Sequence, residues 1–217
     1  MMLCLHSDSQ YISPWVLTAY VALTEKQLPF SLRTIDLEQG EQRDADYRTR
    51  SLTGKVPVLQ HDEFWLSESV AIAEYLAEMF PFPSHPRLFP ADFPQRARCR
   101  QVMMWLRTDL VALRQERPTT TVFFPSARAF NLPLSSAAQA AADELVRVAD
   151  ALIPAGDQTL FPAWCIADAD LAMALMRLHQ NNHTLPPKLA AYAEAQWARP
   201  SLQAFLQLPR APAKDSK

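Results

Sequence analysis

The chain has 217 residues, of which 49% are hydrophobic, and this is enough to bury a core in one large domain or two small ones. Its 21 Lys and Arg residues against 23 Asp and Glu give a formal net charge of -2, so we expect no polyanionic partner such as nucleic acid. The sequence starts without the basic and apolar stretches of a secretory signal and holds no apolar run long enough to span a bilayer, which predicts a cytoplasmic protein with no membrane partner.

The first residues predict a strand, a helix and a second strand. Short apolar or alternating runs at 3–6 and 31–36 are typical of strands. Between them, apolar residues from 16 to 23 recur on one helical face. Pro14 suits the first turn of that helix, where a missing N–H costs nothing, and Ser13 precedes it as the N-cap.

A hairpin and a second helix follow a polar stretch. Apolar runs at 56–60 and 63–66 are joined by His61 and Asp62, which predicts two strands of a hairpin. Apolar residues from 72 to 80 are spaced for one buried helical face, and Ser67 or Ser69 is expected to cap that helix. The first unit is therefore β-α-β followed by β-β-α.

Beyond this unit the sequence predicts helices alone. Prolines are dense between 81 and 94, which favours an extended linker, so we predict a first domain at 1–81, a linker at 82–90 and an all-helical second domain at 91–217. Apolar residues keep helical spacing over 99–113, 145–152 and 171–178. The polar tail at 209–217 is expected to fray.

Three short motifs carry a resemblance to a known superfamily. They are Ser13-Pro14-Trp15 at the start of the first helix, the run Gly54-Lys55-Val56-Pro57-Val58-Leu59, and Leu66-Ser67-Glu68-Ser69 leading into the second helix. With the order of elements, they make the chain resemble the glutathione transferase superfamily over nearly its whole length, and most closely its bacterial YfcF-like members. The resemblance implies an α/β thioredoxin-like N-terminal domain, an all-α C-terminal helical bundle and glutathione as co-substrate.

A fourth motif resembles the capping box of the family's second domain. The run is Trp164-Cys165-Ile166-Ala167-Asp168, in which Cys165 stands where the family carries Ser or Thr. We expect the Asp168 carboxylate to cap the helix and the reciprocal bond from Cys165 to be weaker.

The resemblance assigns a glutathione site to residues of the first domain. A cis bond before Pro57 would turn the backbone of Val56 outward to pair with the cysteinyl part of glutathione, whereas a plain turn proline is the alternative. The helix start at Ser69 suits the γ-glutamyl carboxylate and Glu68 suits the ammonium, unless the two only form a helix cap with an exposed acid. Lys55 is assigned to the glycyl carboxylate, with a solvated lysine as the alternative.

Ser13 is the predicted catalytic residue. Its hydroxyl would donate a charge-assisted hydrogen bond to the glutathione thiolate, and the amino end of the helix would add a favourable field. A simple N-cap is the alternative, and Ser9 and Tyr11 are neighbouring hydroxyls that could replace it. Because a serine forms no mixed disulfide, reductase chemistry is disfavoured.

The electrophile pocket is assigned to Tyr11, Trp105, Arg114 and Arg117, with core packing as the alternative for Trp105. The predicted activity is conjugation of glutathione to small electrophiles, with glutathione-dependent peroxidase activity toward organic hydroperoxides as a further activity. A non-enzymatic interaction or stress-regulator protein of the same fold, and a zeta-like isomerase, are the alternatives. A homodimer is implied by the resemblance.

No metal site is predicted. His179 and His183 stand four residues apart, as two ligands on one helical face would, but a third ligand is missing. Three widely spaced cysteines, at positions 4, 99 and 165, fit buried thiols in a reducing compartment better than a disulfide framework or a zinc ribbon.

Overall fold

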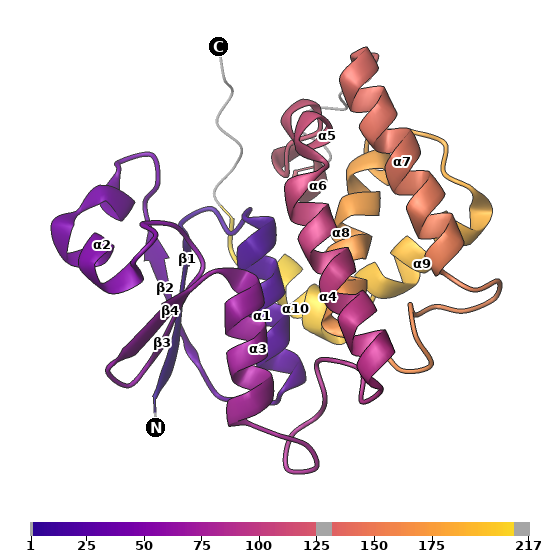
Figure 1. Ribbon diagram of the computed structural model, residues 1–217. Helices are drawn as coiled ribbons and strands as arrows, with labels where there is room; N and C mark the ends of the chain where they lie inside the picture. The colour runs from indigo at the N-terminus through magenta and orange to yellow at the C-terminus, as the bar shows by residue number, and fades with distance from the viewer. Residues whose placement is uncertain (1, 125–131, 211–217) are drawn as a thin grey trace. The chain divides into compact units, whose positions relative to one another are not determined.

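The computed structural model describes residues 2–124 and 132–210 (Figure 1). The chain divides into two compact units. The first holds the residues up to Leu88 together with 207–210, and the second runs from Phe89 to Leu206. Of the tail at 209–217 that is expected to fray, residues 211–217 lie outside the described residues. The expectation is wrong for Arg210, which is hydrogen-bonded to the carbonyl oxygen of Tyr11.

The first unit is built on a four-stranded mixed sheet in the order β2-β1-β3-β4. Its strands are β1 (Leu3–Asp8), β2 (Ser31–Ile35), β3 (Val58–His61) and β4 (Phe64–Ser67). β1 pairs in parallel with β2 and antiparallel with β3, and β3 pairs antiparallel with β4. The parallel pair needs a crossover, which α1 (Pro14–Glu25) supplies. The predicted β-α-β and β-β-α order is confirmed.

Helices cover both faces of this sheet. α1 packs against α3 (Ser69–Met79) beside the strands, as Figure 1 shows. Side chains alternate along β1, so the fully buried Leu5 and its neighbour His6 point to opposite faces. The rings of His6 and of Tyr47 in α2 (Ala45–Ser51) lie at a tilt of 56° with centroids 6.3 Å apart, which places α2 on the His6 side.

The starts of α1 and α3 hold residues that the sequence assigns to the functional site. Ser13 caps α1 with its side-chain oxygen and Pro14 opens the first turn, as the sequence predicts. The expectation that Ser67 or Ser69 caps α3 is wrong. Glu68 occupies the cap position at φ 72 without a side-chain cap bond, and Ser69 is the first helical residue. The short helix α2 and a 3-10 turn before it were not predicted.

The second unit is all-helical over the residues that the structure describes, and this prediction is confirmed. Its helices are α4 (Phe93–Thr108), α5 (Val111–Glu116), α6 (Thr120–Phe123), α7 (Ser136–Leu152), α8 (Ile166–His179), α9 (Pro187–Trp197) and α10 (Pro200–Leu206). α8 is buried on all sides from Ile166 to Leu178, so it forms the centre of the bundle. The apolar stretch at 99–113 is split between α4 and α5 because the backbone leaves helical dihedrals at Leu110 (ψ 30°).

Asp168 anchors the start of α8. Its buried carboxylate accepts hydrogen bonds from the N–H of Cys165 and of Leu160 and from the Tyr192 hydroxyl, each at 2.8 Å. The expected cap by Asp168 is therefore confirmed. The Cys165 sulfur lies 3.6 Å from that of Cys99, and the contact with this second thiol, followed by burial, raises the pKa of Cys165. The Cys165 thiol is thus packed as a neutral group.

Candidate functional site

One end of the sheet gathers the three segments that the sequence assigns to glutathione. His6 of β1 pairs with Val58 of β3, and Val58 pairs with Ser67 of β4, so these residues form one row across the sheet. Past this row β1 runs toward Ser13, β3 is preceded by 55–57, and β4 is followed by 68–69. Residues separated by up to 56 positions in the sequence are therefore brought to one edge.

Ser13 stands at the amino end of α1 with its side chain half-buried. Its Oγ accepts the N–H of Val16 at 3.3 Å. Within the part of the chain that the structure describes, no acceptor takes the Ser13 hydroxyl proton. A hydroxyl carries one proton and two lone pairs, so this oxygen can cap the helix and still donate a hydrogen bond outward. Capping and activation of a thiol are therefore compatible at this residue.

The segment before β3 offers free backbone. The peptide bond between Val56 and Pro57 is cis, as expected from the resemblance. Val56 is half-buried, and among the described residues nothing pairs with its backbone N–H or C=O. An extended peptide can bind such a pair of groups as an added strand. Lys55 is exposed, and its side chain makes no hydrogen bond or ion pair with another residue of the described ranges.

Tyr47 holds this segment in place, and sequence reasoning missed it. The Tyr47 hydroxyl donates a hydrogen bond of 3.1 Å to the carbonyl oxygen of Lys55. Burial raises the pKa of Tyr47 to about 12, so the hydroxyl keeps its proton for this bond. Tyr47 is one of two buried residues of α2, and a lone aromatic in a polar stretch was the only sequence signal.

The segment after β4 supplies a charge and a helix start. Glu68 is exposed, and its carbonyl accepts the N–H of Ile72 in the first turn of α3. Ser69 is buried at 4% exposure and is the first residue of the helix. The first N–H groups of a helix and its positive dipole end attract carboxylates, whereas the Glu68 carboxylate attracts an ammonium group. Both charges of an amino-acid group can therefore be met here.

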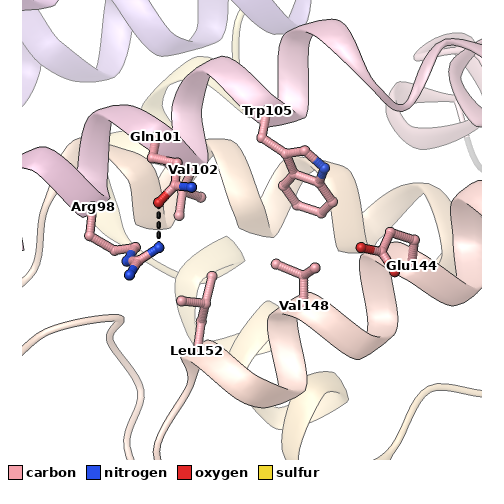
Figure 2. Close-up of a pocket in the computed structure, with 7 residues that line it drawn as sticks. All are labelled: Arg98, Gln101, Val102, Trp105, Glu144, Val148 and Leu152. Carbon is pink, nitrogen blue, oxygen red and sulfur yellow. Dashed lines mark hydrogen bonds between the residues drawn. The ribbon is translucent and has the colours of Figure 1, made fainter.

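The four residues assigned to an electrophile pocket fall in both units. Tyr11 lies half-buried in the first unit at φ 52°. In the second unit, Trp105 lines a pocket of about 290 Å³ between α4 and α7, as Figure 2 shows. The full lining of this pocket is Arg98, Gln101, Val102, Trp105, Glu144, Val148 and Leu152.

Arg114 and Arg117 lie outside that lining and bond to the protein itself. Arg114 donates to the carbonyl of Leu106 at 2.8 Å, and burial followed by the charge of Arg107 lowers its pKa. Arg117 is 2% exposed and donates to Nε2 of His183 at 3.1 Å and to the carbonyl of Leu132 at 2.6 Å. Its guanidinium is thus engaged by the fold.

The two histidines that stand four residues apart have protein partners. His179 Nε2 lies 3.2 Å from a carboxylate oxygen of Glu194, and His183 accepts the bond from Arg117. Among residues 2–124 and 132–210, no group of three or more His, Cys, Asp or Glu side chains could hold a metal ion. In the same residues, every helix is too short or too polar to cross a bilayer.

Comparison with known families identifies the family to which this chain belongs. Residues 12–79 match the family model "Glutathione S-transferase, N-terminal domain", and residues 92–211 match "Glutathione S-transferase, C-terminal domain". The chain belongs to the glutathione S-transferase superfamily.

Solved and curated relatives agree with this assignment. A glutathione transferase homolog from Burkholderia gl BGR1, solved with bound glutathione, is 40% identical, with a TM-score of 0.79 over 95% of this chain and 97% of the other. A glutathione S-transferase from Rhodospirillum rubrum F11 shares the fold at 22% identity, with a TM-score of 0.74 over 97% of this chain and 94% of the other. Bovine glutathione S-transferase theta-1 is 35% identical over 91 residues, which span 42% of this chain and 37% of the relative.

Proposed function

We propose that this protein is a glutathione transferase that binds glutathione at the edge formed by Ser13, 55–57 and 68–69 and joins its sulfur to small electrophiles. The observation that carries the proposal is the register row from β1 through β3 to β4, because it brings a hydroxyl, an open backbone pair and a helix start with an adjacent acid to one end of the sheet. The glutathione bound to the homolog from Burkholderia supports the choice of ligand.

Each part of glutathione has a complementary group in the first unit. The Val56 N–H and C=O pair with the backbone of the cysteinyl residue, which sets the peptide along the edge of the sheet. Glu68 attracts the γ-glutamyl ammonium, and the amino end of α3 at Ser69 attracts its carboxylate. Lys55 is exposed beside Val56 and takes the glycyl carboxylate. Pro57 ends the open segment, since β3 begins at the next residue.

Ser13 then acts on the sulfur. A free thiol has a pKa of about 8.5, and lowering it by two units requires about 2.7 kcal/mol of preferential stabilisation of the thiolate. The Ser13 hydroxyl contributes a charge-assisted hydrogen bond and the amino end of α1 contributes a favourable field. The thiolate attacks an electrophilic carbon and displaces its leaving group. With an organic hydroperoxide, the thiolate instead attacks the peroxide oxygen, and the O–O bond breaks to release an alcohol. A second glutathione then converts the resulting sulfenic acid to glutathione disulfide and water.

We keep as candidate contacts for the electrophile Tyr11 in the first unit and, in the second unit, Trp105, Arg114 and Arg117. A pocket for an electrophile needs apolar surface with a few polar groups, and the lining of the pocket at Trp105 offers both.

The protein acts as a homodimer in the cytoplasm. Helix α4 carries exposed apolar side chains, Phe93 at 77% and Met104 at 48% exposure, which suit a contact with a second copy. The three cysteines are free and buried, as is usual in a reducing compartment. Sedimentation at micromolar concentration should give twice the mass of one chain, and a monomer would contradict the proposed assembly.

Calorimetric titration with glutathione, followed by conjugation to an activated aryl halide, tests the function. Binding heat with turnover supports a transferase. Binding without turnover on aryl halides or hydroperoxides would favour a non-enzymatic relative or a zeta-like isomerase, and the absence of any heat would refute the proposed site. Arg147→Met is the matched control, because the Arg147 side chain is 67% exposed, pairs with Glu144 three residues earlier on α7 and is not among the residues assigned to glutathione.

A further inference from the structure

One carboxylate accepts hydrogen bonds from the loop that leads into Ser13. Asp8, the last residue of β1, is 4% exposed. Its two carboxylate oxygens accept the N–H of Ile12 at 2.8 Å and the N–H of Ser13 at 3.1 Å. The N–H of Tyr11 also donates to the Asp8 carbonyl at 3.1 Å. Three successive amides of the loop therefore point back to one residue.

Arg210 holds the same loop through the carbonyl oxygen of Tyr11. Nε and one terminal nitrogen of the guanidinium donate to the Tyr11 carbonyl at 3.2 and 3.0 Å. A third nitrogen donates to the carbonyl of Leu208, which fixes the guanidinium on its own segment. Arg210 stands 199 residues beyond Tyr11, yet 207–210 belong to the first compact unit. The end of the described chain is thus a structural part of this loop.

Tyr11 shows why such support is needed. It has φ 52°, in the left-handed region that residues other than glycine rarely adopt. A backbone of this kind persists only when its surroundings over-determine it, and it is common at functional sites. The bonds from Asp8 and Arg210 on both sides of the peptide supply that constraint.

Charge balance links the two residues. Burial lowers the pKa of Arg210, and the opposite charge of Asp8 partly offsets this effect. The Asp8 carboxylate lies 3.1 Å from the backbone nitrogen of Ser13, so its negative charge sits close to the place where a thiolate would form. An unbalanced carboxylate there would oppose a second anion, whereas the guanidinium compensates for it.

We propose that Asp8 and Arg210 are positioning residues for Ser13, which fix the Tyr11–Ser13 loop and balance the charge beneath the bound sulfur. Neither residue touches glutathione. They act through the orientation of the Ser13 hydroxyl and through the field at the amino end of α1. This inference rests on the proposed function, since the oriented group matters only where a thiolate forms.

The test compares Arg210→Met and Arg210→Lys with the parent and with the control Arg147→Met. For Arg210→Met we expect kcat to fall about tenfold with little change in the dissociation constant for glutathione, and the pH midpoint of kcat/KM to rise by about one unit. Arg210→Lys keeps the positive charge, so its pH midpoint should lie closer to that of the parent. Arg147→Met should leave both quantities unchanged.

Two outcomes would overturn the inference. The first is an Arg210→Met variant that loses stability but keeps the parent's kcat and pH midpoint, because such a variant has lost only a structural contact. The second is unchanged hydrogen exchange of the Ile12 and Ser13 amides in Arg210→Met, because the loop would then be fixed without Arg210. The exchange measurement needs no glutathione, so it decides the positioning role even if the parent fails to bind the tripeptide and the proposed function falls.

Discussion

Replacing Ser13 by alanine separates two roles of one oxygen, the cap of α1 and the donor to a thiolate. The lost cap is a bond of 3.3 Å to the N–H of Val16. Removal of a serine cap costs about 0.5–2 kcal/mol, and this long bond places the expected loss in unfolding free energy at about 0.5–1 kcal/mol. A hydrogen bond to a charged group contributes about 1.5–3 kcal/mol, so kcat/KM should fall about 10- to 150-fold.

Ser135→Ala is the matched control for this experiment. Ser135 caps α7 and its Oγ accepts the N–H of Ala138, also at 3.3 Å. Its Oγ also donates to the Glu116 carboxylate, so the loss of this hydroxyl should cost at least as much stability as the loss of the Ser13 hydroxyl. Urea unfolding measures the stability of each variant, and conjugation of an activated aryl halide at saturating glutathione measures its rate. Ser135→Ala should be destabilised and fully active.

A Ser13→Ala variant that loses stability but keeps the parent's rate would refute the reasoning. The serine would then be a cap alone. The hydroxyls of Ser9 and Tyr11 would be the next residues to replace.

Three further predictions concern binding, acid stability and the helical unit. Glu68→Gln should raise the KM for glutathione about fivefold while kcat is retained, since an exposed ion pair contributes at most about 1 kcal/mol, and an unchanged KM would remove Glu68 from the site. Burial, aided by the charge of Arg33 and partly offset by Gln60, lowers the pKa of His6. As the pH falls, the unfolded chain, with a histidine pKa of about 6.5, therefore takes up a proton before the folded chain does. The contribution of neutral His6 to the free energy of unfolding is complete above that pH and is lost as the pH drops below it. Urea titrations should show a smaller decline in His6→Leu than in the parent, and equal declines would contradict this account. Asp168→Ala leaves three buried donors without their acceptor and should cost at least about 3 kcal/mol in urea unfolding, so a loss under about 1 kcal/mol would show that other groups or water satisfy them.

The sequence predicted those elements whose buried face repeats at a regular spacing. α1 and the strands of the hairpin have such a pattern, and the cap and first turn at Ser13 and Pro14 follow from residue type alone. α2 was missed because only Tyr47 and Ser51 of its seven residues are buried, which leaves no helical period to detect. The break between α4 and α5 was missed because apolar spacing continues through it.

The site residues that lie in short motifs next to strand ends could be predicted from the sequence. The residues that hold them in position could not. Ser13, Val56 and Glu68 lie within motifs that the family resemblance marks. Asp8 and Arg210 bond to backbone groups, which carry no side-chain signature, and Arg210 acts from the opposite end of the chain. Contacts of this kind follow from the folded path of the chain rather than from any local pattern.

A crystal structure of the protein with glutathione tests the central claim most directly. We predict the glutathione sulfur within about 3.5 Å of the Ser13 Oγ, the cysteinyl backbone paired with Val56, and the γ-glutamyl group between Glu68 and the start of α3. Glutathione bound elsewhere, or bound with its sulfur turned away from Ser13, would contradict the account.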